Sequence, residues 1–174
     1  MNPDITTFVT PTGLEVRLRP LRPEDAPLLV DLFQHLGPES RYQRFQMPLE
    51  HPDPAWVERA ARALAAVPPP GRGWLALADL PDEPGAVVGG GRYVVTGEGV
   101  AEVSVTVRDD LQGQGIGTAI LRVLITAARE AGIRRLTAYT NPTNRAVMAM
   151  VHRLRLPHRV ETHAGETYIE IELA

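Results

Sequence analysis

The feature that most constrains this chain is a glycine-rich loop between a strand pattern and a long helix pattern. Residues 100–107 (VAEVSVTV) alternate apolar and polar side chains, which predicts a half-buried strand. The run Gln112-Gly113-Gln114-Gly115-Ile116-Gly117 follows, and apolar residues then recur at helical spacing as far as Gly132. Glycines leave backbone N–H groups accessible, and a helix N-terminus adds a partial positive charge. The sequence therefore predicts a cradle for a phosphate-bearing ligand.

Two common phosphate-binding loops do not fit this segment. A P-loop requires a lysine after its last glycine, and all 18 basic residues of this chain are arginines. A dinucleotide-binding loop requires G-x-G-x-x-G, and Thr118 stands where the third glycine belongs. A purely structural glycine turn remains an alternative, although glycines at three alternate positions cost conformational entropy without a gain in packing.

The rest of the chain alternates strand and helix patterns. Apolar and charged residues alternate over 14–19 and again over 166–173, which is typical of half-buried strands. Residues 28–36 carry a helical apolar stripe that ends at Gly37-Pro38. Further expected elements are strands at 74–80, 86–96 and 136–140, helices at 40–45 and 53–67, and a helix opened by residues 141–144. This interleaving predicts a mixed α/β sheet, and we expect residues 1–174 to form a single domain.

Composition excludes several classes of function. The chain has no cysteine, so it has no disulfide, no cysteine nucleophile and no thiolate metal site. The net charge of −3 gives no indication of nucleic-acid binding, and the five histidines lack the spacing of a metal site, so we expect no metal. No apolar run approaches the roughly 20 residues of a membrane span, and no signal peptide is visible, so the expected location is cytoplasmic.

The central segment resembles the acetyl-coenzyme A signature of the GCN5-related N-acetyltransferases (GNAT). Their motif has Gln or Arg, then glycine three residues later and Gly or Ala two residues after that, which Gln112, Gly115 and Gly117 match. Segments 19–25 (RPLRPED) and 38–45 (PESRYQRF) further resemble the acetyltransferase domain of bacterial protein lysine acetyltransferases of the Pat type. The resemblance implies an α/β fold with a mixed, mostly antiparallel central sheet, flanking helices and a β-loop-α unit that binds acyl-CoA.

This resemblance implies an acetyl-CoA-dependent N-acetyltransferase that transfers acetyl directly to a primary amine in a ternary complex. It assigns backbone groups of the glycine loop to the pyrophosphate and main-chain groups of the preceding strand to the pantetheine arm. The residues implied in acetyl-CoA binding are Val105, Thr106, Val107, Gln112, Gly113, Gln114, Gly115, Ile116, Gly117, Thr118, Asn144 and Arg145.

Glu102 is the candidate general base. A lysine-like amine has a pKa of about 10.4 and arrives protonated, so its proton must be removed before attack. The resemblance places the catalytic glutamate of Pat-like enzymes at Glu102, which shares one strand face with Ser104 and Thr106. The alternatives are that Glu102 is a solvent-facing strand residue, or that Glu98 in the preceding hairpin loop is the base.

The sequence departs from the family pattern on the last helix. The tyrosine that protonates the leaving thiolate in many members is replaced by Val151, and the usual Gly-Phe pair reads Arg155-Leu156. These departures leave the general acid unassigned, and His152 is interpreted as a surface residue. They also keep open a second hypothesis, a non-catalytic acyl-CoA-binding or sensing module.

Two further assignments stay open. Asn144 either caps a helix or contacts the coenzyme, and Arg145 is the best single candidate for attracting its phosphates. The amine acceptor is either a protein lysine, which the resemblance to Pat favours, or a small molecule. Residues 39–45 and the strand near Tyr93 are expected to form the acceptor wall. A homodimer is also left open.

Overall fold

The computed structural model describes residues 4–174, and its strands form a single eight-stranded sheet. The strand order is β1-β2-β3-β4-β5-β6-β8-β7. The strands are β1 (Thr6–Val9), β2 (Glu15–Pro20), β3 (Arg72–Leu80), β4 (Glu83–Gly97), β5 (Val100–Val107), β6 (Arg135–Thr140), β7 (His158–His163) and β8 (Glu166–Glu172). Neighbouring strands are antiparallel except β5 and β6, which are parallel. The predicted mixed, mostly antiparallel sheet is therefore confirmed.

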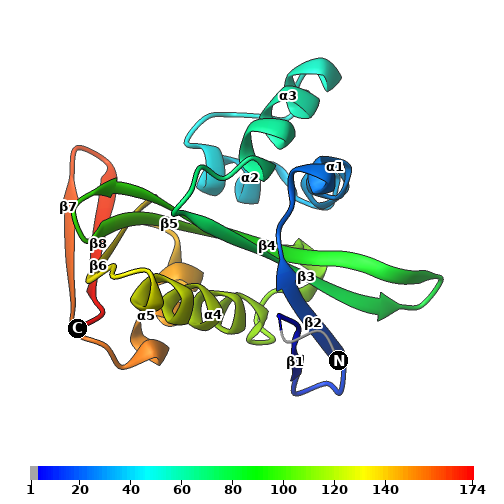
Figure 1. The fold of residues 1–174 in the computed structure, drawn as a ribbon. Helices are drawn as coiled ribbons and strands as arrows, with labels where there is room; N and C mark the ends of the chain where they lie inside the picture. Colours follow the sequence, from blue (N-terminus) through cyan, green and yellow to red (C-terminus); the bar gives the residue numbers. More distant parts are fainter. Residues whose placement is uncertain (1–3) are drawn as a thin grey trace.

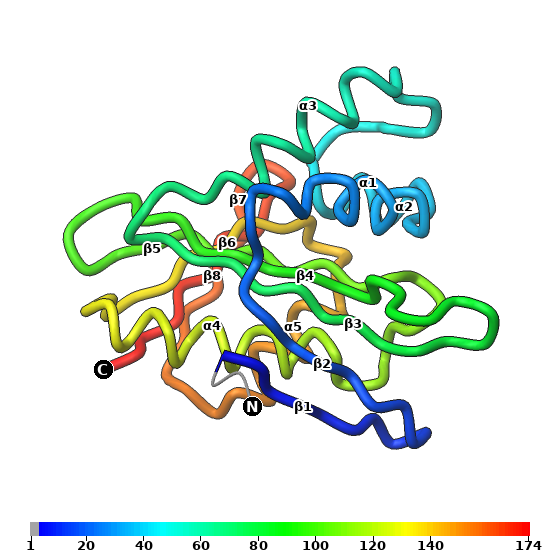
Figure 2. Tube along the Cα trace, turned by 45° about the vertical axis from the view of Figure 1, so that its right-hand side comes forward, coloured from blue at the N-terminus to red at the C-terminus, as the bar shows by residue number. Residues whose placement is uncertain are grey.

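Helices cover both faces of this sheet. They are α1 (Ala26–Gln34), α2 (Pro38–Phe45), α3 (Pro54–Ala65), α4 (Ile116–Glu130) and α5 (Arg145–Leu154), with short 3-10 turns at Pro23–Asp25 and Asp109–Leu111. In Figure 1, α1, α2 and α3 lie above the sheet and α4 and α5 lie below it. Figure 2 shows the same separation after a turn of the molecule. Within residues 4–174, no helix has the length and apolar character that a membrane crossing needs.

The main core lies between α4 and the centre of the sheet. Ile116, Ile120 and Leu124 of α4 are almost fully buried, as is Tyr93 of β4. Two glycines of β4 let the helix come close, because a Cβ on Gly91 would lie 2.8 Å from Ile120. This close packing fixes the position of α4 relative to β4 and β5 and, with it, the position of the glycine loop that precedes the helix.

The strands that sequence patterns missed lie at the two edges of the sheet. β1 and β7 were not expected, and all six residues of β7 are exposed. A strand that buries no face has no reason to alternate apolar and polar residues, so period-2 reasoning cannot detect it. The helix expected at 53–67 ends earlier, at Ala65, and begins after Asp53, whose carboxylate accepts a hydrogen bond from the N–H of Ala55 at 3.1 Å.

Candidate functional site

The parallel strands β5 and β6 separate near their middle. They pair over Val100–Glu102 and Arg135–Thr137, and the last paired residues are Glu102 and Thr137. Beyond this point, the edge of β5 from Val103 to Val107 has no strand partner on that side among residues 4–174. Backbone groups on an unpaired edge are free to bind a ligand. The free edge runs directly to the glycine loop.

The glycine loop ends in an uncapped helix N-terminus. Gly113 and Gly115 have φ of 77° and 84°, a region that side chains with a Cβ rarely adopt. Gly115 is the residue before α4 and supplies no side-chain cap. The N–H groups of Ile116, Gly117 and Thr118 have no acceptor within the helix. An anion is the natural acceptor for them, so the loop fits the pyrophosphate of a coenzyme.

Side chains of the loop brace it rather than cover it. The Gln112 amide donates to the carbonyl of Val107 at 3.3 Å, and Oε1 of Gln114 accepts from the hydroxyl of Thr12 at 2.8 Å. At Gly117 the structure gives a separate reason for glycine, because a Cβ there would lie 3.2 Å from Sδ of Met150. Gly117 thus allows α4 to pack against α5, while Gly113 and Gly115 provide the turn.

The start of α5 provides a second polar group of the site. Oδ1 of Asn144 accepts from the N–H of Val147 at 3.2 Å, and its Nδ2 donates to Oγ1 of Thr140 at 2.9 Å. The capping interpretation of Asn144 is therefore confirmed, and its contact to the coenzyme remains a prediction. Arg145 follows as the exposed first residue of α5, and this first turn holds no acidic residue. A cation is unfavourable at a helix N-terminus unless an anion binds there.

A cleft lies on the opposite face of β5, beneath α1 and α2. It encloses about 520 Å³ including the part open to solvent. Ser104 and Thr106 of β5 line it, opposite Arg92 and Gly90 of β4 in the strand register. The remaining lining residues are mostly apolar: Leu21, Leu29, Leu32, Phe33, Leu36, Arg44, Phe45, Leu64, Trp74 and Gly91. Arg44, Phe45 and Arg92 belong to the segments expected to form the acceptor wall.

Glu102 is exposed and lies on the same strand face as Ser104 and Thr106. It interacts electrostatically with Arg44 and Arg92. Burial, together with the like charge of Arg92, lowers the pKa of Arg44 to about 10, and the charge of Glu102 opposes this change. Burial also lowers the pKa of Arg92. Glu102 therefore stands beside a positively charged cleft, at the point where β5 and β6 separate. Glu98 lies in the exposed β4–β5 turn and does not line the cleft.

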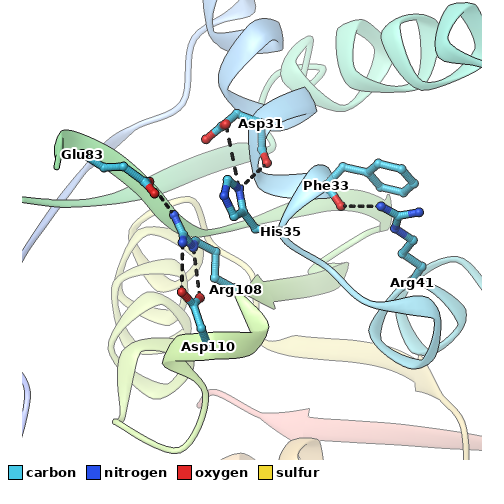
Figure 3. Close-up of polar contacts among 7 residues, drawn as sticks. All are labelled: Asp31, Phe33, His35, Arg41, Glu83, Arg108 and Asp110. Carbon is cyan, nitrogen blue, oxygen red and sulfur yellow. Dashed lines mark hydrogen bonds and ion pairs between the residues drawn. The ribbon is translucent and has the colours of Figure 1, made fainter. Parts of the chain in front are cut away.

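A buried arginine fixes the turn between β5 and the glycine loop. The side chain of Arg108 is 4% exposed and pairs with Glu83 at 3.0 Å and with Asp110 at 2.9 Å. Figure 3 shows this arginine between the two carboxylates, close to the segment that carries His35. Asp109 joins the turn to that segment, because its carboxylate accepts from the N–H of Gly37 at 2.8 Å. Sequence reasoning missed this network, since an arginine beside two aspartates reads as a solvated turn.

The last helix supplies no phenol at the position where many family members have one. Val151 is 4% exposed and packs in the core. His152 is exposed, as expected, and lies beside His158 with 5.4 Å between ring centroids. Arg155 ends the helix at φ 53°, in the left-handed region that glycine favours. The general acid therefore remains unassigned.

The parallel pair that separates at Glu102, followed by an uncapped glycine-rich helix start, fits the fold of acyltransferases that bind acyl-CoA. The sequence pattern of the Acetyltransferase (GNAT) family matches residues 30–155, and the chain belongs to this family. The family is one of acetyltransferases, and the relatives that follow carry that name.

Individual relatives agree with this assignment. The chain is 29% identical over 167 residues to "Acetyltransferase Pat" of Mycolicibacterium smegmatis, covering 86% of this chain and 45% of that protein. It is 31% identical over 138 residues to "Acetyltransferase PA5475" of Pseudomonas aeruginosa, covering 78% of this chain and 71% of that protein. The crystal structure of the GNAT domain of S. lividans PAT superposes with a TM-score of 0.81 at 25% identity, covering 99% and 98% of the two chains. The chain therefore spans less than half of the first relative.

Proposed function

We propose that this chain acetylates a primary amine by direct transfer within a ternary complex, with Glu102 as the general base. The observation that carries the proposal is the separation of β5 from β6 directly after Glu102, which leaves a free strand edge leading to the uncapped start of α4. The carboxylate of Glu102, the free edge of β5 and the glycine loop thus follow one another along the chain. The acceptor is a protein lysine or a small-molecule amine.

Each demand of the reaction has a group in this arrangement. When bound, acetyl-CoA supplies an acetyl group activated as a thioester. Backbone groups of residues 112–118 hold the pyrophosphate, aided by Asn144 and Arg145, and main-chain groups of residues 105–107 hold the pantetheine arm. Glu102 takes the proton of the incoming ammonium, directly or through a water molecule. A backbone N–H on the free edge of β5 stabilises the charge that develops on the carbonyl oxygen. Water is the candidate proton donor for the leaving thiolate.

The decisive experiment is Glu102→Gln, which keeps the shape of the side chain and removes its basicity. General base catalysis is worth about 10²–10⁴-fold, so kcat at pH 7 should fall by at least about 100-fold. CoA affinity and melting temperature should stay near wild type, because the side chain of Glu102 makes no hydrogen bond or ion pair with residues 4–174 that the substitution could break. The deficit should shrink as pH rises and free amine becomes abundant.

Glu98→Gln is the matched control, since it removes a carboxylate from the neighbouring turn and should change kcat far less. Activity of Glu102→Gln close to wild type at pH 7 would show that the base lies elsewhere. Loss of CoA binding or of folding in this variant would mean that Glu102 is structural. Direct transfer also requires initial-rate lines that intersect when the amine is varied, and parallel lines would contradict it.

A further inference from the structure

The cleft beside Glu102 contains two arginines, Arg44 and Arg92, that form no ion pair with any residue of 4–174. Some other arginines of this chain have acidic partners, as in the pairs Arg17–Asp79, Arg19–Asp25 and Arg108–Asp110. The guanidinium of Arg44 lies over the ring of Phe45 but makes no ion pair and no hydrogen bond within residues 4–174, although it is partly buried and lines the cleft. Within residues 4–174, the guanidinium of Arg92 makes a single hydrogen bond, to the carbonyl of Leu64 at 3.3 Å. A partly buried guanidinium group without an acidic partner is stabilised when it binds an anion, because the charge that lost water then gains hydrogen bonds to an opposite charge.

Glu102 does not serve as that partner, because no ion pair joins it to either arginine within the described part of the chain. It does lie close. Arg92 is opposite Ser104 in the register, which makes Glu102 its diagonal neighbour across the two strands, at a typical Cα separation of about 7–8 Å. A group bound by the arginines would thus sit within a few bonds of an amine placed at Glu102.

We propose that the acceptor is an amine that also carries a carboxylate close to it, with the carboxylate bound by Arg44 and Arg92. This inference rests on the proposed function of Glu102. An amine without a carboxylate would bring its positive charge close to Arg44 and Arg92, which repel it, as well as to Glu102. An amino acid can place its ammonium group beside Glu102 and its carboxylate beside the two arginines, so each charge meets one of opposite sign. The wall formed by Leu29, Phe33 and Phe45 further fits an apolar body, so the acceptor class is an apolar amino acid.

The test compares leucine, methionine and phenylalanine with their amides as acceptors. The amide has no carboxylate charge, and its amine is less basic than that of the acid. More of the amide is therefore present as free amine at pH 7, so an enzyme that did not bind the carboxylate would acetylate the amide at least as fast as the acid. The thiol released from acetyl-CoA is followed with a thiol reagent, to which a chain without cysteine adds no background. We expect kcat/KM for at least one acid to exceed that of its amide by about tenfold or more.

Arg44→Gln and Arg92→Gln should each remove most of this preference, because they raise KM for the acid far more than KM for the amide. Arg59→Gln, which removes an exposed arginine of α3 outside the cleft, should leave the preference intact. CoA affinity should be unchanged in all three variants. Loss of CoA binding in the cleft variants would assign the arginines to the coenzyme and overturn the inference.

A second arm covers a carboxylate supplied by a neighbouring side chain. Peptides with one lysine flanked by glutamate or by glutamine are compared in the same assay, and acetylation of the glutamate peptide in preference to the free amino acids would overturn the apolar amino acid as the acceptor. Amides and glutamine peptides acetylated as fast as their acids would overturn the inference and leave the proposed function standing. Failure to acetylate any amine would overturn both.

Discussion

The entry into α1 depends on one ion pair, and Asp25→Asn should expose how much that pair contributes. The carboxylate of Asp25 accepts two hydrogen bonds from Arg19, at 2.8 and 2.9 Å, and a third from the N–H of Arg22 at 2.8 Å. The side chains are 10% and 22% exposed for Asp25 and Arg19. This pair links the end of β2 to α1, which forms the apolar wall of the acceptor cleft.

The expected loss follows from that partial burial. Breaking a fully buried pair costs about 3–5 kcal/mol and an exposed one at most about 1 kcal/mol. A pair at 10% and 22% exposure lies between these limits, so Asp25→Asn should lower the free energy of unfolding by about 2–3 kcal/mol. Urea denaturation at pH 7 measures this difference, because urea does not screen charges as guanidinium does. For a chain of this length the melting temperature should fall by about 5–10 °C.

The pH dependence gives the prediction a sign. The hydrogen bonds from Arg19 lower the pKa of Asp25, so the folded state holds the carboxylate ionised more strongly than the unfolded state does. The ionised Asp25 carboxylate therefore stabilises the fold fully above its pKa in the unfolded chain, about 3.9. This stabilisation is lost as the pH falls through the lower pKa that Asp25 has in the folded protein. The gap between wild type and Asp25→Asn should stay constant from pH 7 to pH 5 and shrink below about pH 4.

A matched exposed pair provides the control. Asp79→Asn breaks the ion pair between Asp79 and Arg17, whose side chains are 64% and 34% exposed. It should lower the free energy of unfolding clearly less than Asp25→Asn does. The reasoning would be refuted by equal losses in the two variants, or by a gap for Asp25→Asn that does not change between pH 7 and pH 3.

Three further predictions concern the glycine loop and α5. Gly115→Glu should abolish the thermal stabilisation that CoA gives. Gly132→Glu, at a similar φ of 80°, should lose comparable stability but still be stabilised by CoA. Equal stabilisation of the two variants by CoA would contradict the assignment of the glycine loop to the pyrophosphate. Asn144→Asp should keep the cap and the melting temperature but weaken CoA binding by about tenfold in a titration, and unchanged affinity would leave Asn144 as a cap alone. Arg155→Gly should raise the free energy of unfolding by about 0.5–1 kcal/mol in urea, because it relieves a left-handed arginine at φ 53°, and no gain would refute this.

How far the sequence predicts this fold depends on burial. The strand at Val100–Val107 and the helix that begins at Ile116 have clear apolar periods because each packs one face on the core, and both were predicted correctly. The edge strand His158–His163 has no buried face and left no period to read. The GNAT motif located the helix start because glycines at positive φ are a local requirement, readable without knowledge of the contacts.

The acceptor cleft was less accessible to sequence reasoning, because its charge pattern arises from tertiary contacts. Arg44 belongs to α2 and Arg92 to β4, and sequence alone gave no reason to separate them from the other arginines. What distinguishes them is that both line the cleft beside Glu102 without an ion pair to a described residue, which becomes visible once the strand register sets Arg92 opposite Ser104. Likewise, Arg108 became recognisable as a structural residue through its burial between Glu83 and Asp110.

The two halves of the site share one physical support. The turn that precedes the glycine loop binds the α1–α2 connection through Asp109 and Gly37, and Gln112 lies 3.4 Å from the hydroxyl of Ser40 on α2. Arg44 is one helical turn beyond Ser40 on that helix. The segment that positions the coenzyme cradle therefore also positions the helix that carries an arginine of the acceptor cleft. Because both rest on the same short turn, a displacement of residues 109–112 would alter the donor and acceptor sides of the site together.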